Sequence, residues 1–331
     1  MNSFGRILRV HIFGESHGEC VGITIDGCPA GLSLTPEDLL PDLERRKGGT
    51  QKGATPRQEE DYPIFKSGIF NGKTTGFPIT ILFENKNTRS EDYNKQRSIP
   101  RPGHADWVAH QKFGGNEDYR GGGHFSARLT TGIVAAGAIA KKLMPAIKFN
   151  ATVTEIAGEN DLEKGLQKGI DAKDSVGGII ECKVNGLPGG LGESYFDAVE
   201  SVLSHILFAI PAVRGVEFGT GFAAAKMFGS QHNDAIENMD GETRTNHAGG
   251  IVGGISNGNE LVFRLAVKPT SSTPKIQNSL NWDTGTTEDF SIKGRHDLCV
   301  ALRAPVIVEA VTALVIADFM LLSQHIKRVI A

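Results

Sequence analysis

The sequence predicts an α+β protein built from two similar halves. Short runs with the alternating apolar pattern of strands recur through the 331 residues, with a few helical segments between them. Three glycine-containing motifs of the first half return in the second half in the same order, which indicates an internal duplication. Chance similarity remains an alternative, because glycine turns use few residue types. We expect a single domain over residues 1–331, with halves at about 1–150 and 151–331.

The repeated motifs are turns beside predicted strands. They pair IDGCPAGL at 25–32 with VNGLPGGL at 184–191, GIFNGK at 68–73 with GISNGN at 254–259, and GHAD at 103–106 with GRHD at 294–297. Because the first of these turns occurs in both halves, we interpret it as architectural. The loop GESHG at 14–18 has KDSVG in the corresponding place, so it is the better candidate for a functional loop, and His17 for its acting residue.

The individual elements follow from apolar periodicity and end signals. A helix is expected from Thr35, with Pro36 in its first position, to Arg46, and another from about Leu129 to Met144. In the second of these, Gly132 and Gly137 indicate close packing against a neighbour. The expected strands are residues 6–13, 20–26, 78–83 and 261–267, and a long terminal helix follows Arg303.

Composition excludes several classes of protein. A net charge of −3 and a pI near 6.4 give no bulk attraction to nucleic acid. The four cysteines have no CxxC spacing, which disfavours a zinc site or a disulfide framework and favours a reducing compartment. The N-terminus lacks the apolar core of a signal peptide. The most apolar run, Pro305–Leu322, contains Glu309 and Asp318, so we expect a cytoplasmic protein with no membrane span.

The stretch Arg101–Arg128 has the composition of an anion-binding site. It contains three histidines and three arginines around the triple glycine Gly121–Gly123. Glycines allow a backbone to approach a ligand, arginines bind phosphate or carboxylate, and histidines move protons near neutral pH. A glycine-rich surface loop with solvated charges is the alternative. His104, His110 and His124 are equal candidates at this point.

Four further patches carry similar chemistry. They are GESHG at 14–18, the basic tract at 45–52, residues 246–272 ending in KPTSS, and KGRHDLCVALR at 293–303. The chain has neither a Walker loop nor a dinucleotide GxGxxG motif after a strand. These residue types together indicate an enzyme that uses histidine proton transfer on a phosphorylated or polyanionic small molecule, but they do not define the reaction.

The same motifs resemble those of the chorismate synthase family. The chain has, in the order of that family, GESHG, IDGCPAGL, RRKGG, RPGHAD, RGGGHFSAR, NHAGGIVGGIS, KPTSS and GRHDLCVALRAPVIVEA, from Phe4 to about Asp318. The resemblance implies a lyase that converts 5-enolpyruvylshikimate 3-phosphate to chorismate by anti 1,4-elimination, in which phosphate leaves C3 and a proton leaves C6. It also implies reduced FMN as a transient electron donor, NADPH as a flavin reductant in some members, a homotetramer, and a pseudo-two-fold sandwich with helices between antiparallel sheets.

The resemblance also implies roles for individual residues. His17 would protonate the leaving phosphate, His104 would support protonation of the reduced flavin, and Asp297 would help flavin N5 receive the C6 proton. Substrate contacts are implied for Arg46, Arg101, Arg128 and Arg303, and NADPH contacts for Arg46 and Lys52. FMN contacts are implied for His124, Phe125, Ser126, Gly253, Lys268, Pro269, Thr270, Ser271, Ser272 and Arg295.

Two departures from the family pattern bear on these roles. His124 stands where many members have arginine, so a titratable group replaces a permanent cation. Lys52 stands where some members have arginine, which leaves NADPH binding open.

Two other classes of protein remain as rivals. A metal-assisted phosphohydrolase is disfavoured because no HxH or HExxH spacing occurs, and no metal ligand is expected. A non-catalytic FMN or RNA binder is disfavoured by the 7% aromatic content and the slightly acidic chain.

Overall fold

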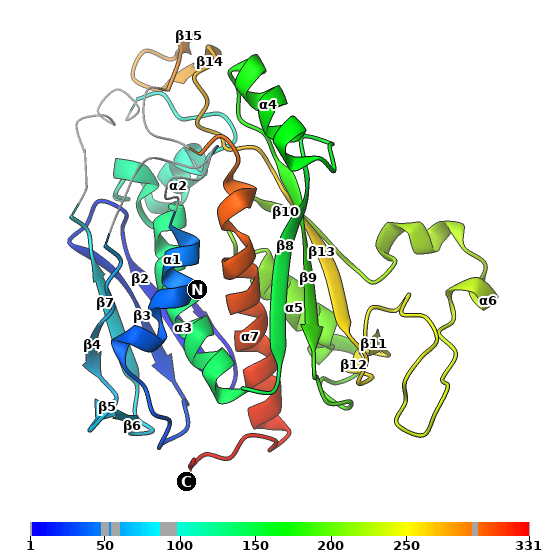
Figure 1. Ribbon diagram of the computed structural model, residues 1–331. Helices are drawn as coiled ribbons and strands as arrows, with labels where there is room; N and C mark the ends of the chain where they lie inside the picture. The colour runs from blue at the N-terminus through cyan, green and yellow to red at the C-terminus, as the bar shows by residue number, and fades with distance from the viewer. Residues whose placement is uncertain (1, 48–52, 54–59, 87–97, 293–296, 331) are drawn as a thin grey trace.

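Two antiparallel sheets enclose a layer of helices in the computed structural model, which describes residues 2–47, 53, 60–86, 98–292 and 297–330 (Figure 1). The first sheet has the order β1-β2-β3-β7-β4. Its strands are β1 Ser3–Phe4, β2 Arg9–Gly14, β3 Cys20–Asp26, β7 Ile79–Glu84 and β4 Ile64–Ser67. Every second residue of β3 faces the core, where Val21, Ile23 and Ile25 are buried.

The second sheet has the order β10-β13-β9-β8 and is also antiparallel. Its strands are β10 Val213–Phe218, β13 Leu261–Val267, β9 Gly178–Asn185 and β8 Lys148–Ile156. The buried residues of β13 again alternate along the strand, as Leu261, Phe263, Leu265 and Val267. Both sheets therefore bury one face against the helices, as the alternating sequence pattern predicts.

Helices fill the space between the sheets (Figure 1). They are α1 Leu40–Arg46, α3 Thr130–Leu143, α5 Val199–Leu207 and α7 Pro305–Leu322. The helices α3 and α7 cross closely because glycine faces alanine: a Cβ added to Gly137 would lie 2.3 Å from the Cβ of Ala310. The predicted α+β sandwich, with helices between antiparallel sheets, is confirmed.

The apolar helix α7 is the centre of the core. It is long and apolar enough to cross a membrane by composition alone, but 83% of it is buried inside the protein. Its two acidic residues are buried and have polar partners. Glu309 binds Arg45 and Lys141, each at 2.7 Å, and Asp318 accepts the backbone N–H groups of residues 6–8 at 2.7–3.0 Å. The charges on α7 are thus compensated within the fold.

The remaining elements lie at the periphery. The helices are α2 Asp106–Phe113, α4 Leu162–Ala172 and α6 Gly229–His232. Three two-stranded hairpins are β5 Ile69–Phe70 with β6 Lys73–Thr74, β11 Ile251–Val252 with β12 Ile255–Ser256, and β14 Gln277–Asn281 with β15 Thr286–Phe290. Short 3₁₀ turns are Pro36–Asp38, Arg120–Phe125, Ala127–Leu129, Tyr195–Asp197, Gly221–Lys226 and Val300–Arg303.

Two predicted boundaries differ from the observed ones. The strand expected at residues 6–13 begins at Arg9, because the backbone of residues 6–8 donates to Asp318 instead of to a neighbouring strand. The helix expected from Thr35 is a 3₁₀ turn followed by α1 from Leu40. Pro41 has no backbone N–H to continue a preceding helix, so it occupies the first turn of a new one.

Equivalent turns in the two halves make the same hydrogen bonds. The Thr74 hydroxyl donates to the carbonyl of Pro29 at 2.6 Å and accepts the N–H of Leu32 at 2.9 Å. In the second half, the Ser256 hydroxyl donates to the carbonyl of Pro188 at 2.7 Å and accepts the N–H of Leu191 at 2.9 Å. The following strands also pair alike, β3 with β7 and β9 with β13. These equivalences support the internal duplication that we propose.

Candidate active site

The triple glycine brings two distant histidines together. Gly121, Gly122 and Gly123 all have positive φ, so their backbone follows a path that other residues rarely adopt. A Cβ on Gly121 would lie 2.4 Å from Cδ2 of His17, and one on Gly122 would lie 3.2 Å from Nε2 of His104. The N–H of Ser16 donates to the carbonyl of Gly123 at 3.1 Å. The GESHG loop therefore packs on the glycines, with His17 and His104 against adjacent residues.

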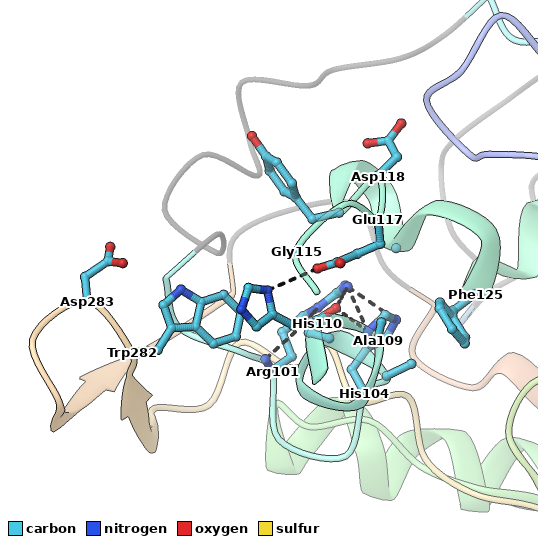
Figure 2. Close-up of a pocket in the computed structure, with 14 residues that line it drawn as sticks. Arg101, His104, Ala109, His110, Gly115, Glu117, Asp118, Phe125, Trp282 and Asp283 are labelled. Carbon is cyan, nitrogen blue, oxygen red and sulfur yellow. Dashed lines mark hydrogen bonds and ion pairs between the residues drawn. The ribbon is translucent and has the colours of Figure 1, made fainter. Parts of the chain in front are cut away.

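A carboxylate orients His104. Asp106 accepts from Nε of Arg101 at 2.7 Å, and its Oδ1 lies 2.5 Å from Nδ1 of His104. Burial alone would raise the pKa of Asp106, but its bonds to Arg101 and His104 outweigh burial and hold that pKa well below the usual range. Figure 2 shows Arg101 beside His104, and Nη2 of Arg101 lies 3.0 Å from Nδ1 of His104. A His–Asp pair two residues apart is the signal in RPGHAD that could have predicted this role for Asp106.

Asp61 joins two of the predicted substrate arginines. It lies 2.8 Å from Nη2 of Arg46 and forms a second ion pair with Arg128, and all three residues are buried. Burial raises the pKa of Asp61, but the two guanidinium groups outweigh burial and lower it. No motif in the sequence indicated Asp61. Arg46 and Arg128 are therefore partly neutralised inside the protein, where the sequence predicted them as direct anion clamps.

A third arginine extends this cluster towards the terminal helix. Nε of Arg303 donates to the backbone carbonyl of Arg46 at 3.0 Å, and its Nη1 lies 3.0 Å from a carboxylate oxygen of Asp297. The pKa of Arg46 is lowered to about 10, chiefly by burial. The neighbouring cations Arg303 and Arg128 also lower this pKa, whereas Asp61 raises it. Arg46 thus lies close enough to both other arginines to be repelled by them, which favours an anion near this cluster.

A cavity of about 520 Å³ opens beside His104. Part of its lining is apolar and comes from residues 208–213, from the end of α5 to the start of β10, which the sequence did not single out. Another part is polar. Among the predicted site residues, the cavity is lined by Arg101, His104, His124, Phe125, Ser126, Lys268, Pro269, Thr270, Ser271, Ser272 and Asp297. A planar apolar ligand that carries an anionic group matches such a lining.

Polar atoms at this cavity are left without partners. Nδ1 of His124 lies 2.9 Å from the carbonyl of Gly14, whereas its Nε2 is buried and makes no hydrogen bond among the described residues. The hydroxyl of Thr270 is likewise buried and makes no hydrogen bond among the described residues. Buried polar groups in proteins nearly always have partners, so these two atoms indicate a bound polar ligand. Two contacts hold the KPTSS run in place, from Lys268 Nζ to Gly103 O at 2.6 Å and from Arg101 Nη1 to Ser272 Oγ at 3.4 Å.

Other predicted residues lie elsewhere. Gly253 occupies the turn between β11 and β12 and does not line this cavity. Arg46 and Arg303 line a small adjoining cavity of about 20 Å³, which shares Thr130 with the large one. Lys52 and Arg295 lie outside the described residues. Within the described ranges, no group of three histidine, cysteine or acidic side chains is placed to hold a metal ion.

A buried histidine, a half-buried one, an arginine cluster and a cavity with polar and apolar lining are together typical of an enzyme that acts on a small anionic ligand. Comparison with known proteins narrows this class. The family model for chorismate synthase matches residues 8–321. The chain is 66% identical to a chorismate synthase of Chitinophaga pinensis over 99% of both chains, and 42% identical to one of Dehalococcoides mccartyi over 99% of both.

A solved structure agrees with these sequence matches. The fold is similar to a crystal structure of chorismate synthase with a TM-score of 0.74 and 26% identity, covering 97% of this chain and 93% of that one. The chain belongs to the chorismate synthase family. It is therefore a lyase that converts 5-enolpyruvylshikimate 3-phosphate to chorismate.

Proposed function

We propose that His17 and His104 carry the proton transfers of this elimination, His17 as the acid for the leaving phosphate and His104 on the flavin side. The observation that carries the proposal is the triple-glycine loop, which packs against both rings. His17 is 8% exposed, so water has little access to it. Asp106 fixes the ring orientation of His104 through its contact with Nδ1. One well-placed acid or base contributes roughly 100- to 10,000-fold in rate.

We also propose reduced FMN as the cofactor of the large cavity. The residues fit it, because the apolar wall suits a flavin ring and the run Lys268–Ser272 suits a phosphate. The two unpartnered atoms, Nε2 of His124 and Oγ1 of Thr270, supply further polar contacts. Reduced flavin supplies a transient electron to the substrate and recovers it. Asp297, which lines the cavity, is proposed to help the flavin receive the C6 proton.

The arginines are proposed to hold the substrate anions. Arg101 lines the large cavity and keeps its orientation through Asp106. Arg46, Arg128 and Arg303 share two carboxylates, Asp61 and Asp297, so the cluster retains one positive charge. A net cation in a buried cluster attracts a phosphate or carboxylate group. Arg46 is also the proposed contact for NADPH, together with Lys52.

The proposed assembly is a cytoplasmic homotetramer that binds neither nucleic acid nor a membrane. Large apolar side chains exposed on the second half support a subunit interface. Figure 1 shows that the segment around α6 projects away from the second sheet. The exposed fractions are 85% for Tyr195, 94% for Phe196, 82% for Phe222, 76% for Phe228, 72% for Ile236 and 101% for Met239.

An anaerobic assay tests the function and the source of electrons together. The protein is mixed with substrate and FMN, and the flavin is reduced either by dithionite or by added NADPH. Chorismate formed in both mixtures means that the chain reduces its own flavin, and chorismate with dithionite alone means that it depends on another reductant. Absence of chorismate with fully reduced flavin would contradict the proposal.

A further inference from the structure

The hairpin β14–β15 carries an aromatic contact that no step of the proposed reaction uses. Trp282, in the turn of this hairpin, stacks on His110 of α2 with ring centroids 4.6 Å apart and an interplanar angle of 18°. Trp107 of the same helix lies against Trp282 at 6.1 Å. On its other side, Nδ1 of His110 is 3.4 Å from a carboxylate oxygen of Glu117 (Figure 2). The contact thus joins the hairpin to the first turns after the RPGHAD motif.

Polar contacts fasten the same hairpin to the start of that motif. The N–H of Trp282 donates to the carbonyl of Ser98 at 3.0 Å, and the hydroxyl of Ser279 donates to the carbonyl of Pro100 at 2.9 Å. Asp283 accepts a hydrogen bond from the Ser98 hydroxyl. Since Arg101 follows directly, the position of the hairpin and that of the arginine are coupled.

In the sequence, the hairpin closely follows the run Lys268–Ser272, which lines the large cavity. Gln277 begins β14 only five residues after Ser272, and Asp297 follows the end of β15 at Phe290 by seven residues. Within the described residues the two strands pair only with each other and join neither main sheet. The hairpin therefore depends on its contacts with residues 98–110 for a defined position.

We propose that the Trp282–His110 stack positions the active site. It holds the hairpin on α2, and thereby keeps the run Lys268–Ser272 and the Asp297 segment at a fixed distance from Arg101 and His104. A second cavity of about 420 Å³ lies between the stack and His104, and it shares Arg101, His104 and Phe125 with the large cavity. The inference rests on the proposed function, because it assigns His110 and Trp282 a role in shaping the proposed flavin and substrate site.

Trp282→Ala is the decisive variant, and Trp282→Phe is its conservative counterpart. Loss of one aromatic pair should weaken flavin binding roughly 3- to 10-fold and raise KM for substrate similarly, with a smaller change in kcat. His110→Ala should do the same, whereas Trp282→Phe should retain most of the affinity. Flavin binding is measured by fluorescence titration with oxidised and with reduced FMN. Phe77→Ala, an exposed aromatic residue next to the distant hairpin β5–β6, is the matched control.

Tryptophan fluorescence reports on the contact itself. The chain has only two tryptophans, Trp107 and Trp282, and both belong to this cluster. His110→Ala should therefore change the emission spectrum of the free protein while leaving its urea midpoint unchanged, since neither main sheet is affected. If His110→Ala lowered the free energy of unfolding by as much as it lowered the free energy of flavin binding, the role of the stack would be merely structural and the inference would be overturned.

The two proposals can fail separately. If Trp282→Ala binds flavin as tightly as the unchanged protein and has the same KM, the positioning role is wrong while the elimination reaction stands. If no form of the protein makes chorismate but Trp282→Ala still binds flavin more weakly, the reaction assignment fails and the positioning of the flavin cavity stands.

Discussion

At the scale of single residues, Asp61 is a buried carboxylate that neutralises two buried arginines. It pairs with Arg46 and Arg128, and all three side chains are shielded from water. Removing one partner of a buried ion pair leaves an uncompensated charge, which costs far more than the pair contributes. Asp61 therefore maintains the arginine cluster and the local fold at the same time.

Asp61→Ala is expected to lower the free energy of unfolding by about 3 kcal/mol or more. The measurement is urea denaturation followed by circular dichroism. Asp26→Ala is the control, because Asp26 is half-exposed, pairs with Arg9 at 3.7 Å and accepts the N–H of Gly27 at 2.9 Å, and its loss should cost less than about 1 kcal/mol. Equal costs for the two variants would contradict the buried-pair interpretation.

Asp61 and Asp106 also predict how stability depends on pH. Both have pKa values lowered in the folded protein by neighbouring cations, against the effect of burial. Such groups stabilise the fold fully above their unfolded pKa of about 3.9, and that contribution is lost as pH falls through the lower folded pKa. Stability should therefore decline steeply below about pH 4. In Asp61→Asn, the urea midpoint should therefore fall less steeply as pH is lowered from 7 to 2. If the midpoint depended on pH in the same way as in the unchanged protein, Asp61 would not contribute to this loss of stability.

His17 and His104 are the residues whose loss should affect rate most. His17→Ala and His104→Ala are each expected to lower kcat roughly 100- to 10,000-fold, with flavin binding largely retained. The assay is chorismate formation with chemically reduced FMN. His11→Ala, at an exposed position of β2 between β1 and β3, should keep normal activity. Near-normal kcat in both test variants would remove the proton-transfer assignment.

At the scale of elements, the contact between α3 and α7 decides how closely the two halves approach. Gly137 of α3 meets Ala310 of α7 with no room for a further methyl group. The sequence predicted close packing at Gly137 and Gly132, and the structure confirms both, with Gly132 against Gly22 and Ile23 of β3. Which helix would approach Gly137 could not be predicted, because that depends on residues 173 positions away.

Gly137→Ala is expected to destabilise the protein by roughly 1–3 kcal/mol from overpacking, although alanine favours a helix by about 1 kcal/mol. Thermal unfolding measures the net effect. Gly229→Ala is the matched control, since an added Cβ at that position has no heavy atom within 4 Å. A gain in stability for Gly137→Ala would mean that the two helices can separate without cost.

At the scale of the whole molecule, the unpaired apolar surface of the second half predicts association. Phe222 and Phe228 lie on the projecting segment and are mostly exposed. The protein should elute as a species of four times the chain mass in size-exclusion chromatography with light scattering. The double variant Phe222→Ser, Phe228→Ser should give smaller species. Phe70→Ser on the first half, which is 70% exposed, is the comparison, and a monomeric unchanged protein would disprove the tetramer.

Much of this protein follows from the sequence alone. Strand alternation, helix ends and the order of motifs depend on neighbouring residues, so they predicted the α+β class, strands β2, β3 and β7 of the first sheet and β13 of the second, and the family. The histidines of GESHG and RPGHAD and the KPTSS run were likewise recognisable as local motifs.

Tertiary structure alone decided which of these motifs meet. It joined Arg46 and Arg128 through Asp61, formed the apolar wall from residues 208–213, and left Gly253 out of the cavity lining. It also stacked Trp282 on His110 across 172 positions of the chain. The physical reason is that ion pairs, stacking contacts and cavity walls arise from distances between remote segments, and those distances are set by how helices and sheets pack.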